Sequence, residues 1–301
     1  MKASDDVGQV VLGFDGGWRM QKLLQEAAGE AVRRETGLAI VMVSRAVLDP
    51  GLSASSRSSA EHRAETSAHR HLTRAAESVR ARHPHLPVTT HHLTEEDARD
   101  ATYPLASAQL LVVGTIGPHG RRAFSPESVS RILLRAARCP VLVVPHDVPI
   151  ESRLRKHHTV TVGVGEQASE AGVLQAAWTE AQRRECDLAL FHAYQDQSDD
   201  TPALSLRRAA DRVADALAAA DVHLGAGGYV VFGHDRPATA LTRQARDTQL
   251  LVIGSRPGSL AGQVPGSVGL EIIGSLHCPL LVIPDPVPDP WSRSATRTAT
   301  A

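Results

Sequence analysis

The amino-acid sequence predicts an α/β protein made of two doubly wound parallel sheets in tandem. The segment 109–114 returns 140 positions later at 249–254, and the segment 139–145 returns 139 positions later at 278–284. Two such matches in the same order indicate a duplicated module. Aromatic residues form only 3% of the chain, so its core has to be built mainly from Val, Leu, Ile and Ala, which favours α/β layers.

The first half alternates short apolar segments with segments of helical periodicity, which is typical of parallel βαβ units. Its expected strands are residues 9–14, 38–43, 88–93, 110–114 and 141–144. Its expected helices are residues 18–35, 61–82, 95–106 and 126–137. Gly37 is expected to cap the first helix, and the Ser-rich residues 50–59 are expected to form a loop.

The second half repeats this order of elements. Its expected strands are residues 159–164, 188–192, 227–232, 250–254 and 280–283. Its expected helices are residues 167–184, 203–220, 237–246 and 266–276. The predicted domains are therefore residues 1–147 and 157–285, joined by a linker over 146–157. The segment 286–301 is rich in Pro, Ser, Thr and Ala and is predicted to be a disordered tail.

The composition of the chain argues against several classes of binding partner. The formal net charge is -1, so the chain has no overall basic field that would attract nucleic acid or a membrane surface. No apolar run approaches the length of a membrane span, and the N-terminus has no signal-peptide pattern. Three cysteines without a CxxC pair favour a reduced, cytoplasmic location. The spacing of the histidines matches no metal site, and Cys139 and Cys278 are expected to be buried structural thiols.

Several motifs carry a resemblance to a known family. The first strand ends in Asp15-Gly16, a fourth strand ends in Gly114, and Ser128-Val129-Ser130 precedes a helix that ends before Cys139. With their counterparts in the second half, these motifs make the chain similar to tandem members of the universal stress protein family. The resemblance implies Rossmann-like sheets of strand order 3-2-1-4-5 with helices on both faces. It also implies an internal pseudo-dimer through the last strands, 141–144 and 280–283, and leaves a homo-oligomer open.

The resemblance also implies a nucleotide site in each half. In ATP-binding members the loop after the fourth strand reads Gly, two residues, Gly, nine residues, Gly, then Ser or Thr. Glycines and a helix N-terminus suit phosphate because they leave the backbone N–H groups free to approach it. In the first half the matching positions are Asp15 as the acidic residue, Val43 as the adenine contact, Val113, Gly114, Gly117, Ser128, Val129 and Ser130.

The first half departs from this pattern at Glu127, where the family has glycine. A carboxylate there would meet the phosphates. Two unit charges about 4 Å apart repel by about 1 kcal/mol in water and about 4 kcal/mol at an effective dielectric of 20. The first site is therefore expected to bind ATP weakly.

The second half departs from it differently. Gly165 stands at the acidic position, although Glu166 is adjacent to it. Pro257 stands at the second glycine and removes an N–H donor. Gly258 is the available substitute, and the loop is one residue short. The remaining matches are Gly254, Gly266, Ser267 and Val268. The first half is therefore the favoured site for adenine nucleotide.

The resemblance implies a stress-response protein that acts by binding and regulation, with no catalytic residue assigned. One alternative is a degenerate protein-interaction scaffold that binds no nucleotide, and another is a slow ATPase. The chain has no Gly-x-x-x-x-Gly-Lys loop and no evident triad, which argues against an enzyme. Asp15 and Ser128 also have a purely structural interpretation, as a turn residue and a helix N-cap.

Overall fold

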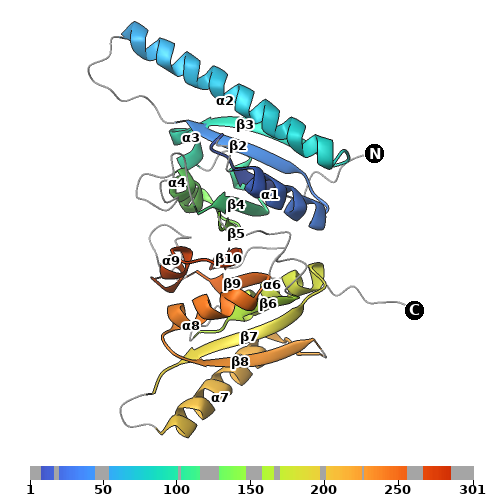
Figure 1. Ribbon diagram of the computed structural model, residues 1–301, viewed down its shortest axis with the longest axis vertical. Helices are drawn as coiled ribbons and strands as arrows, with labels where there is room; N and C mark the ends of the chain where they lie inside the picture. The colour runs from blue at the N-terminus through green and yellow to red at the C-terminus, as the bar shows by residue number, and fades with distance from the viewer. Residues whose placement is uncertain are drawn as a thin grey trace. The chain divides into compact units, whose positions relative to one another are not determined.

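The chain divides into two compact units, Met1–His146 and Asp147–Ala301, which are described separately below (Figure 1). The structure is a computed structural model. It describes residues 8–16, 20–44, 54–100, 103–115, 129–146, 158–165, 170–196, 201–225, 227–255 and 267–285.

The first unit contains a five-stranded parallel sheet. Its strands are β1 (Val10–Gly13), β2 (Leu38–Ser44), β3 (Val88–Thr94), β4 (Leu110–Gly114) and β5 (Val141–Val144). β1 pairs with β2 and β4, β2 with β3, and β4 with β5, all in parallel. The order is therefore β3-β2-β1-β4-β5, which confirms the predicted 3-2-1-4-5 arrangement.

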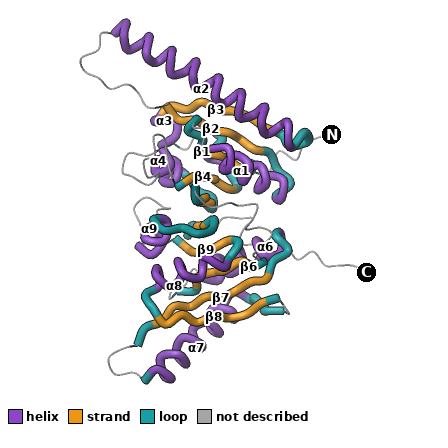
Figure 2. The backbone as a smooth tube through the Cα atoms, viewed as in Figure 1, coloured by secondary structure: helices purple, strands orange, loops and turns teal. Residues whose placement is uncertain are grey.

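Helices cover both faces of this sheet (Figure 2). They are α1 (Gln21–Arg33), α2 (Ala54–Arg82), α3 (Glu95–Arg99) and α4 (Val129–Ala136). A short 3-10 helix, η2 (Leu105–Ser107), lies between α3 and β4. α1 packs against α2, whereas α3 packs against α4. The strands between them are buried at successive positions, as in β4, where Leu110 to Val113 are all at most 1% exposed. A strand that is covered on both faces has no polar side to alternate with, which explains the continuous apolar runs in the sequence.

The second unit repeats this architecture. Its strands are β6 (Thr159–Gly163), β7 (Asp187–Tyr194), β8 (Gly228–His234), β9 (Leu250–Gly254) and β10 (Leu280–Ile283). The parallel pairs give the order β8-β7-β6-β9-β10, again 3-2-1-4-5. Its helices are α6 (Glu170–Arg183), α7 (Pro202–Ala220), α8 (Pro237–Gln244), α9 (Ser267–Ile273) and the 3-10 helix η4 (Ala245–Asp247).

Most predicted bounds differ from the structure by three residues or fewer, but two helices differ by more. Helix α2 begins at Ala54, inside the Ser-rich segment expected to be a loop. Serine costs a helix only a few tenths of a kcal/mol relative to alanine, and residues 54–82 contain neither Gly nor Pro. The expected helix over 95–106 is shorter, because α3 ends at Arg99 and is followed by η2. Pro104, which has no N–H group and clashes with the preceding turn, explains why a helix does not continue.

The predicted cap at Gly37 is wrong, because the left-handed residue at the end of α1 is Glu35, with φ 52°. The turn is closed by the Thr36 N–H group, which donates to the Ala31 carbonyl at 3.0 Å. The second unit repeats this turn, with Glu185 at φ 53° and Cys186 donating to the Ala181 carbonyl at 2.9 Å. Glycine is favoured at such positions but is not required.

Candidate functional site

The carboxyl edge of the first sheet brings together residues that are far apart in the sequence. Gly13 is level with Val41 on β2, and Leu12 is level with Val112 on β4. The Phe14 N–H group then donates to the Val41 carbonyl at 2.8 Å. β1 has β2 on one side and β4 on the other. The chain therefore runs from β1 through β2 to β3 in one direction, and then returns past β1 to β4 in the other. Such a switch point is where open α/β sheets bind ligands.

Three of the predicted site residues follow directly at this edge. Asp15 lies two residues beyond Gly13, Val43 lies two residues beyond Val41, and Gly114 ends β4. Val43 is buried, while Asp15 and Gly114 are half-buried and so lie at the boundary between core and surface. Val113 is 1% exposed and belongs to the core. The edge therefore offers a carboxylate, an apolar contact and a glycine on neighbouring strands.

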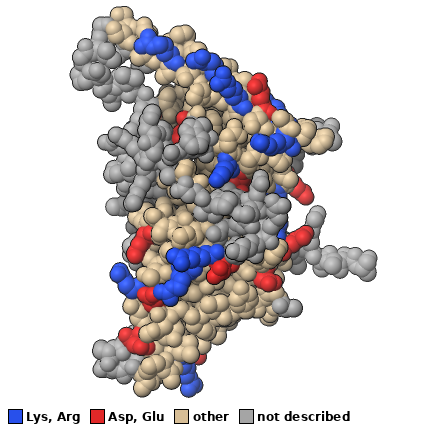
Figure 3. Space-filling model, in the orientation of Figure 1, with Lys and Arg blue, Asp and Glu red and all other residues tan. Residues whose placement is uncertain are grey.

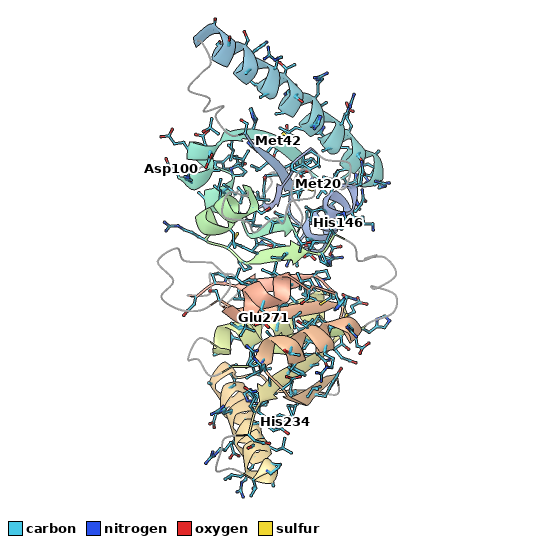
Figure 4. All side chains as sticks on the ribbon, turned by 60° about the vertical axis from the view of Figure 1, so that its left-hand side comes forward. Met20, Met42, Asp100, His146, His234 and Glu271 are labelled. Atoms are coloured by element: carbon cyan, nitrogen blue, oxygen red, sulfur yellow. The ribbon has the colours of Figure 1, made fainter. Side chains whose placement is uncertain are left out.

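The turn after Asp15 is covered by two residues that sequence reasoning missed. Gly16 has φ 80°, and a Cβ atom on it would lie 2.1 Å from Nδ1 of His71 and 2.8 Å from Cε of Met42. His71 comes from α2, and Met42, which is labelled in Figure 4, comes from β2. Only glycine fits this position without displacing one of them. The Asp-Gly pair in the sequence signals the turn, but nothing in the spacing identifies its two covering side chains.

The phosphate end of the first site is mostly beyond the described part of the chain. Gly117, Glu127 and Ser128 lie outside the described residues. Val129 begins α4, and Ser130 is half-buried within that helix. The loop that leaves β4 starts with the Thr115 N–H group, which donates to the Val144 carbonyl at 3.1 Å. The role of these loop residues stays a prediction.

The second unit keeps the backbone geometry of this edge and changes its side chains. The Val164 N–H group donates to the Phe191 carbonyl at 2.9 Å, as Phe14 does to Val41. Gly165, in the position of Asp15, is exposed and provides no carboxylate. His192 replaces Met42, is 2% exposed, and its Nδ1 atom lies 2.9 Å from the Val164 carbonyl oxygen.

The loop positions of the second unit are placed only in part. Gly254 is half-buried at the end of β9, where a Cβ atom would lie 3.0 Å from Cγ2 of Val173. Val268 is half-buried in α9, the helix that Ser267 begins. Pro257, Gly258 and Gly266 lie outside the described residues, so their relation to a ligand stays a prediction.

Burial favours structural roles for Cys139 and Cys278. Burial raises the pKa of the Cys139 thiol to about 12, which suppresses the reactive thiolate. Cys278 is also buried.

The exposed arginines 63, 70 and 74 lie along α2, where Figure 3 shows a row of basic side chains. Within the described residues there is no group of three metal-ligating side chains, and no helix there has the length and apolar character needed to cross a membrane.

Comparison with known proteins identifies the family. The model of the universal stress protein family matches residues 7–145 and 156–284. The universal stress protein Rv2623 of Mycobacterium tuberculosis is 34% identical over 184 residues, with 58% of this chain covered. The chain covers 61% of the length of that relative. Rv2005c of the same organism is 31% identical over 187 residues, with the same shares covered.

A solved structure supports the fold independently. A universal stress protein from Archaeoglobus fulgidus superposes with a TM-score of 0.65 at 16% identity, covering 91% of this chain and 97% of its own. At that identity the likeness concerns the fold alone. The two family matches, however, account for nearly the whole sequence, one in each structural unit. The chain is therefore a tandem-domain member of the universal stress protein family.

Proposed function

We propose that this protein is a cytoplasmic stress-response regulator that acts by binding and senses adenine nucleotide through its first unit. The observation that carries the proposal is the convergence of Asp15, Val43 and Gly114 at the switch point of the first sheet. A carboxylate there can accept hydrogen bonds from ribose hydroxyls, and Val43 gives an apolar contact for a base. In the second unit, Gly165 stands in the position of Asp15 and provides no carboxylate.

Nucleotide affinity is expected to be limited by Glu127. In the first prediction, Glu127→Gly tightens ATP binding, because it removes a negative charge and a side chain from the phosphate end. A gain of about 1–3 kcal/mol corresponds to roughly 5- to 150-fold in affinity. Titration calorimetry of parent and variant measures this change. Adenosine, which has no phosphates, is the matched control ligand and should respond far less.

The same titrations separate this proposal from its alternatives. Equal ATP affinity in parent and variant would show that Glu127 does not face the phosphates. No ATP binding in either protein would favour a degenerate interaction scaffold, in which the glycines serve only the turn. Mass spectrometry of gently purified protein gives an independent answer by identifying any co-purified nucleotide. Slow conversion of that nucleotide to ADP would instead favour an ATPase.

A further inference from the structure

The outer strand of the second sheet, β8 (Gly228–His234), has an open edge. Among the described residues it pairs only with β7, and it is the last strand in the order of its sheet (Figure 1). Its central residues, Val230, Val231 and Phe232, are half-buried, whereas residues 188–192 of β7 are all buried. The strand contains no proline and no charged residue before its final histidine. An apolar edge of this kind is expected to pair with another chain.

The corresponding edge of the first unit is more polar. β3 carries the exposed residues Thr90, His92 and Thr94. α2 packs against both β2 and β3, whereas α7 packs against β7 more than against β8. β8 is therefore both more apolar and less covered than its counterpart, although the two strands occupy the same position in their sheets.

The backbone groups of β8 that face the open edge follow from its pairing with β7. Leu188 is level with Gly228, and its N–H group donates to the Gly227 carbonyl at 2.9 Å. Backbone groups alternate in direction along a strand, so the odd-numbered residues of β8 face β7. The N–H and C=O groups of Val230 and Phe232 therefore face outward, where another strand can meet them.

The side chains on one face of β8 leave this edge accessible. Tyr229 is 43% exposed, but its hydroxyl lies 3.4 Å from Oγ1 of Thr159 on β6, so its ring lies back over its own sheet. Gly233 has no side chain, and a Cβ atom there would lie 2.5 Å from the ring of Phe191 on β7. These two residues share a face with Val231. That face therefore presents Val231 to an incoming strand.

We propose that the second unit binds a second copy of this chain, through antiparallel pairing of the two β8 strands about a two-fold axis at Val231. Such an axis runs perpendicular to the sheet, so paired residues lie on the same face and the residue at the axis pairs with itself. Val231 is the middle residue of β8, so this register overlaps the whole strand. It places Val230 opposite Phe232 of the second copy, where their outward N–H and C=O groups form a hydrogen-bonded pair.

The side chains of β8 are complementary to themselves in this register. An aromatic residue opposite a β-branched one stabilises a pair of strands. The register gives this combination on both sides of the axis, because Val230 of each copy meets Phe232 of the other. Val231 meets Val231 between them. A dimer is therefore favoured over pairing with a peptide of unrelated sequence, which would match these side chains only by chance.

The charges at the two ends of β8 also fit a second copy. In an antiparallel pair, the carboxyl end of one strand lies beside the amino end of the other. Arg236 is exposed just after the carboxyl end, and Asp187 is exposed beside Gly227 at the amino end. The acidic residues at the carboxyl end are engaged by basic neighbours, Asp196 by His234 and Asp235 by Arg243. Arg236 of each copy therefore adds an attraction to Asp187 of the other.

Sedimentation velocity of the full chain tests the proposal. We expect the parent to sediment with the mass of two chains. Val230→Pro removes an outward N–H group that β8 does not use within its own sheet, and the proline ring blocks an incoming strand. It should raise the dissociation constant of the dimer at least about tenfold. Thr90→Pro is the matched control, because Thr90 is exposed on β3 with its N–H group also directed outward, and the dimer should persist.

Cysteine cross-linking tests the register. All cysteine variants carry Cys186→Ser, which removes the partly exposed native thiol. Val231→Cys should form a disulfide across the axis on mild oxidation. Its backbone groups face β7, so the two copies form a non-hydrogen-bonded pair with Cα atoms about 4.5 Å apart, within the range of about 4.4–6.8 Å found in disulfides. Tyr229→Cys is the matched control, because residue 229 lies opposite residue 233 and the two introduced thiols are about 13 Å apart.

Circular dichroism checks the fold of each variant, and if Val230→Pro does not fold, the cysteine variants still decide. The proposal is overturned if the parent is monomeric, or if a folded Val230→Pro variant keeps the affinity of the parent dimer. It is also overturned if Tyr229→Cys cross-links as readily as Val231→Cys. Mass spectrometry that finds a peptide of another protein bound to a single chain would overturn it as well, and would assign the edge to peptide addition.

Discussion

At the scale of single residues, Gly16 holds the turn of the candidate nucleotide site in the first unit. The second prediction is that Gly16→Ala lowers the free energy of unfolding by about 1–3 kcal/mol. Both the φ of 80° and the close approach of His71 oppose a Cβ atom at this position. Chemical denaturation measures the loss.

Gly225→Ala provides the control, because a Cβ atom there would meet nothing within 4 Å. Its effect should stay within about 0.5 kcal/mol. Adding His71→Ala to Gly16→Ala should recover part of the loss, since it removes the nearest obstructing side chain and keeps a good helix former in α2. If the two single glycine variants are equally stable, the turn is loose enough to move away from α2.

The cysteines differ in reactivity because they differ in burial. The third prediction is that iodoacetamide at pH 8 modifies Cys186 first, since that residue is partly exposed. Cys139 has a pKa of about 12, so only about one thiol in ten thousand is ionised at pH 8. Mass spectrometry of the modified peptides measures the order. Rapid labelling of Cys139 in the folded protein would mean that its environment opens readily.

At the scale of elements, the helix that follows the first strand of each unit, α1 or α6, contains a buried ion cluster of its own. Glu30 is fully buried, lies 2.8 Å from Arg33, and also pairs with Arg34. Glu180 is fully buried and lies 3.0 Å from both Arg183 and Arg184. The spacing, with arginines three and four positions after the glutamate, is the same in both units. It places all three side chains on one face of the helix.

The fourth prediction is that Glu180→Gln destabilises the second unit strongly. Removing one partner of a buried ion pair leaves an uncompensated charge and typically costs about 3–5 kcal/mol. Thermal and chemical denaturation measure the loss. The exposed Glu271, labelled in Figure 4, supplies the control variant Glu271→Gln, which should be nearly neutral. A small effect of Glu180→Gln would show that water reaches the arginines.

The sequence predicted the strands better than the helix ends. Each strand is a buried apolar run, so its existence follows from local composition, and the family resemblance supplied the order. The start of α2 was missed because serine is common both in loops and in exposed helices. The Glu35 turn was missed because glycine at 37 offered the more usual signal.

In the candidate sites, too, the sequence predicts some features and not others. The order of the strands brings Asp15, Val43 and Gly114 to one edge, as expected from their positions at strand ends. The approach of His71 to Gly16 depends on how α2 packs over the sheet, and no sequence pattern encodes that distance.

At the scale of the whole molecule, each unit has a complete sheet with helices on both faces. Each should therefore contain enough buried surface to fold alone, because domains of about 150 residues bury close to 70% of the surface of the unfolded chain. The pairing of the last strands, residues 141–144 and 280–283, stays a prediction. Cutting the chain between the units tests it, because an apolar edge strand without its expected partner tends to pair with another copy.

The fifth prediction is that the fragment 1–146 folds and self-associates, whereas the full chain does not use this edge for association. Circular dichroism reports the fold, and sedimentation velocity reports the mass. Val143→Lys in the fragment should shift it toward monomer, since a charge at a buried position of β5 opposes pairing. Thr90→Lys, at an exposed position of β3, should leave it associated. A folded fragment that is monomeric would contradict the predicted edge, because its last strand would then tolerate solvent. An unfolded fragment would instead show that the first unit depends on the second for its stability.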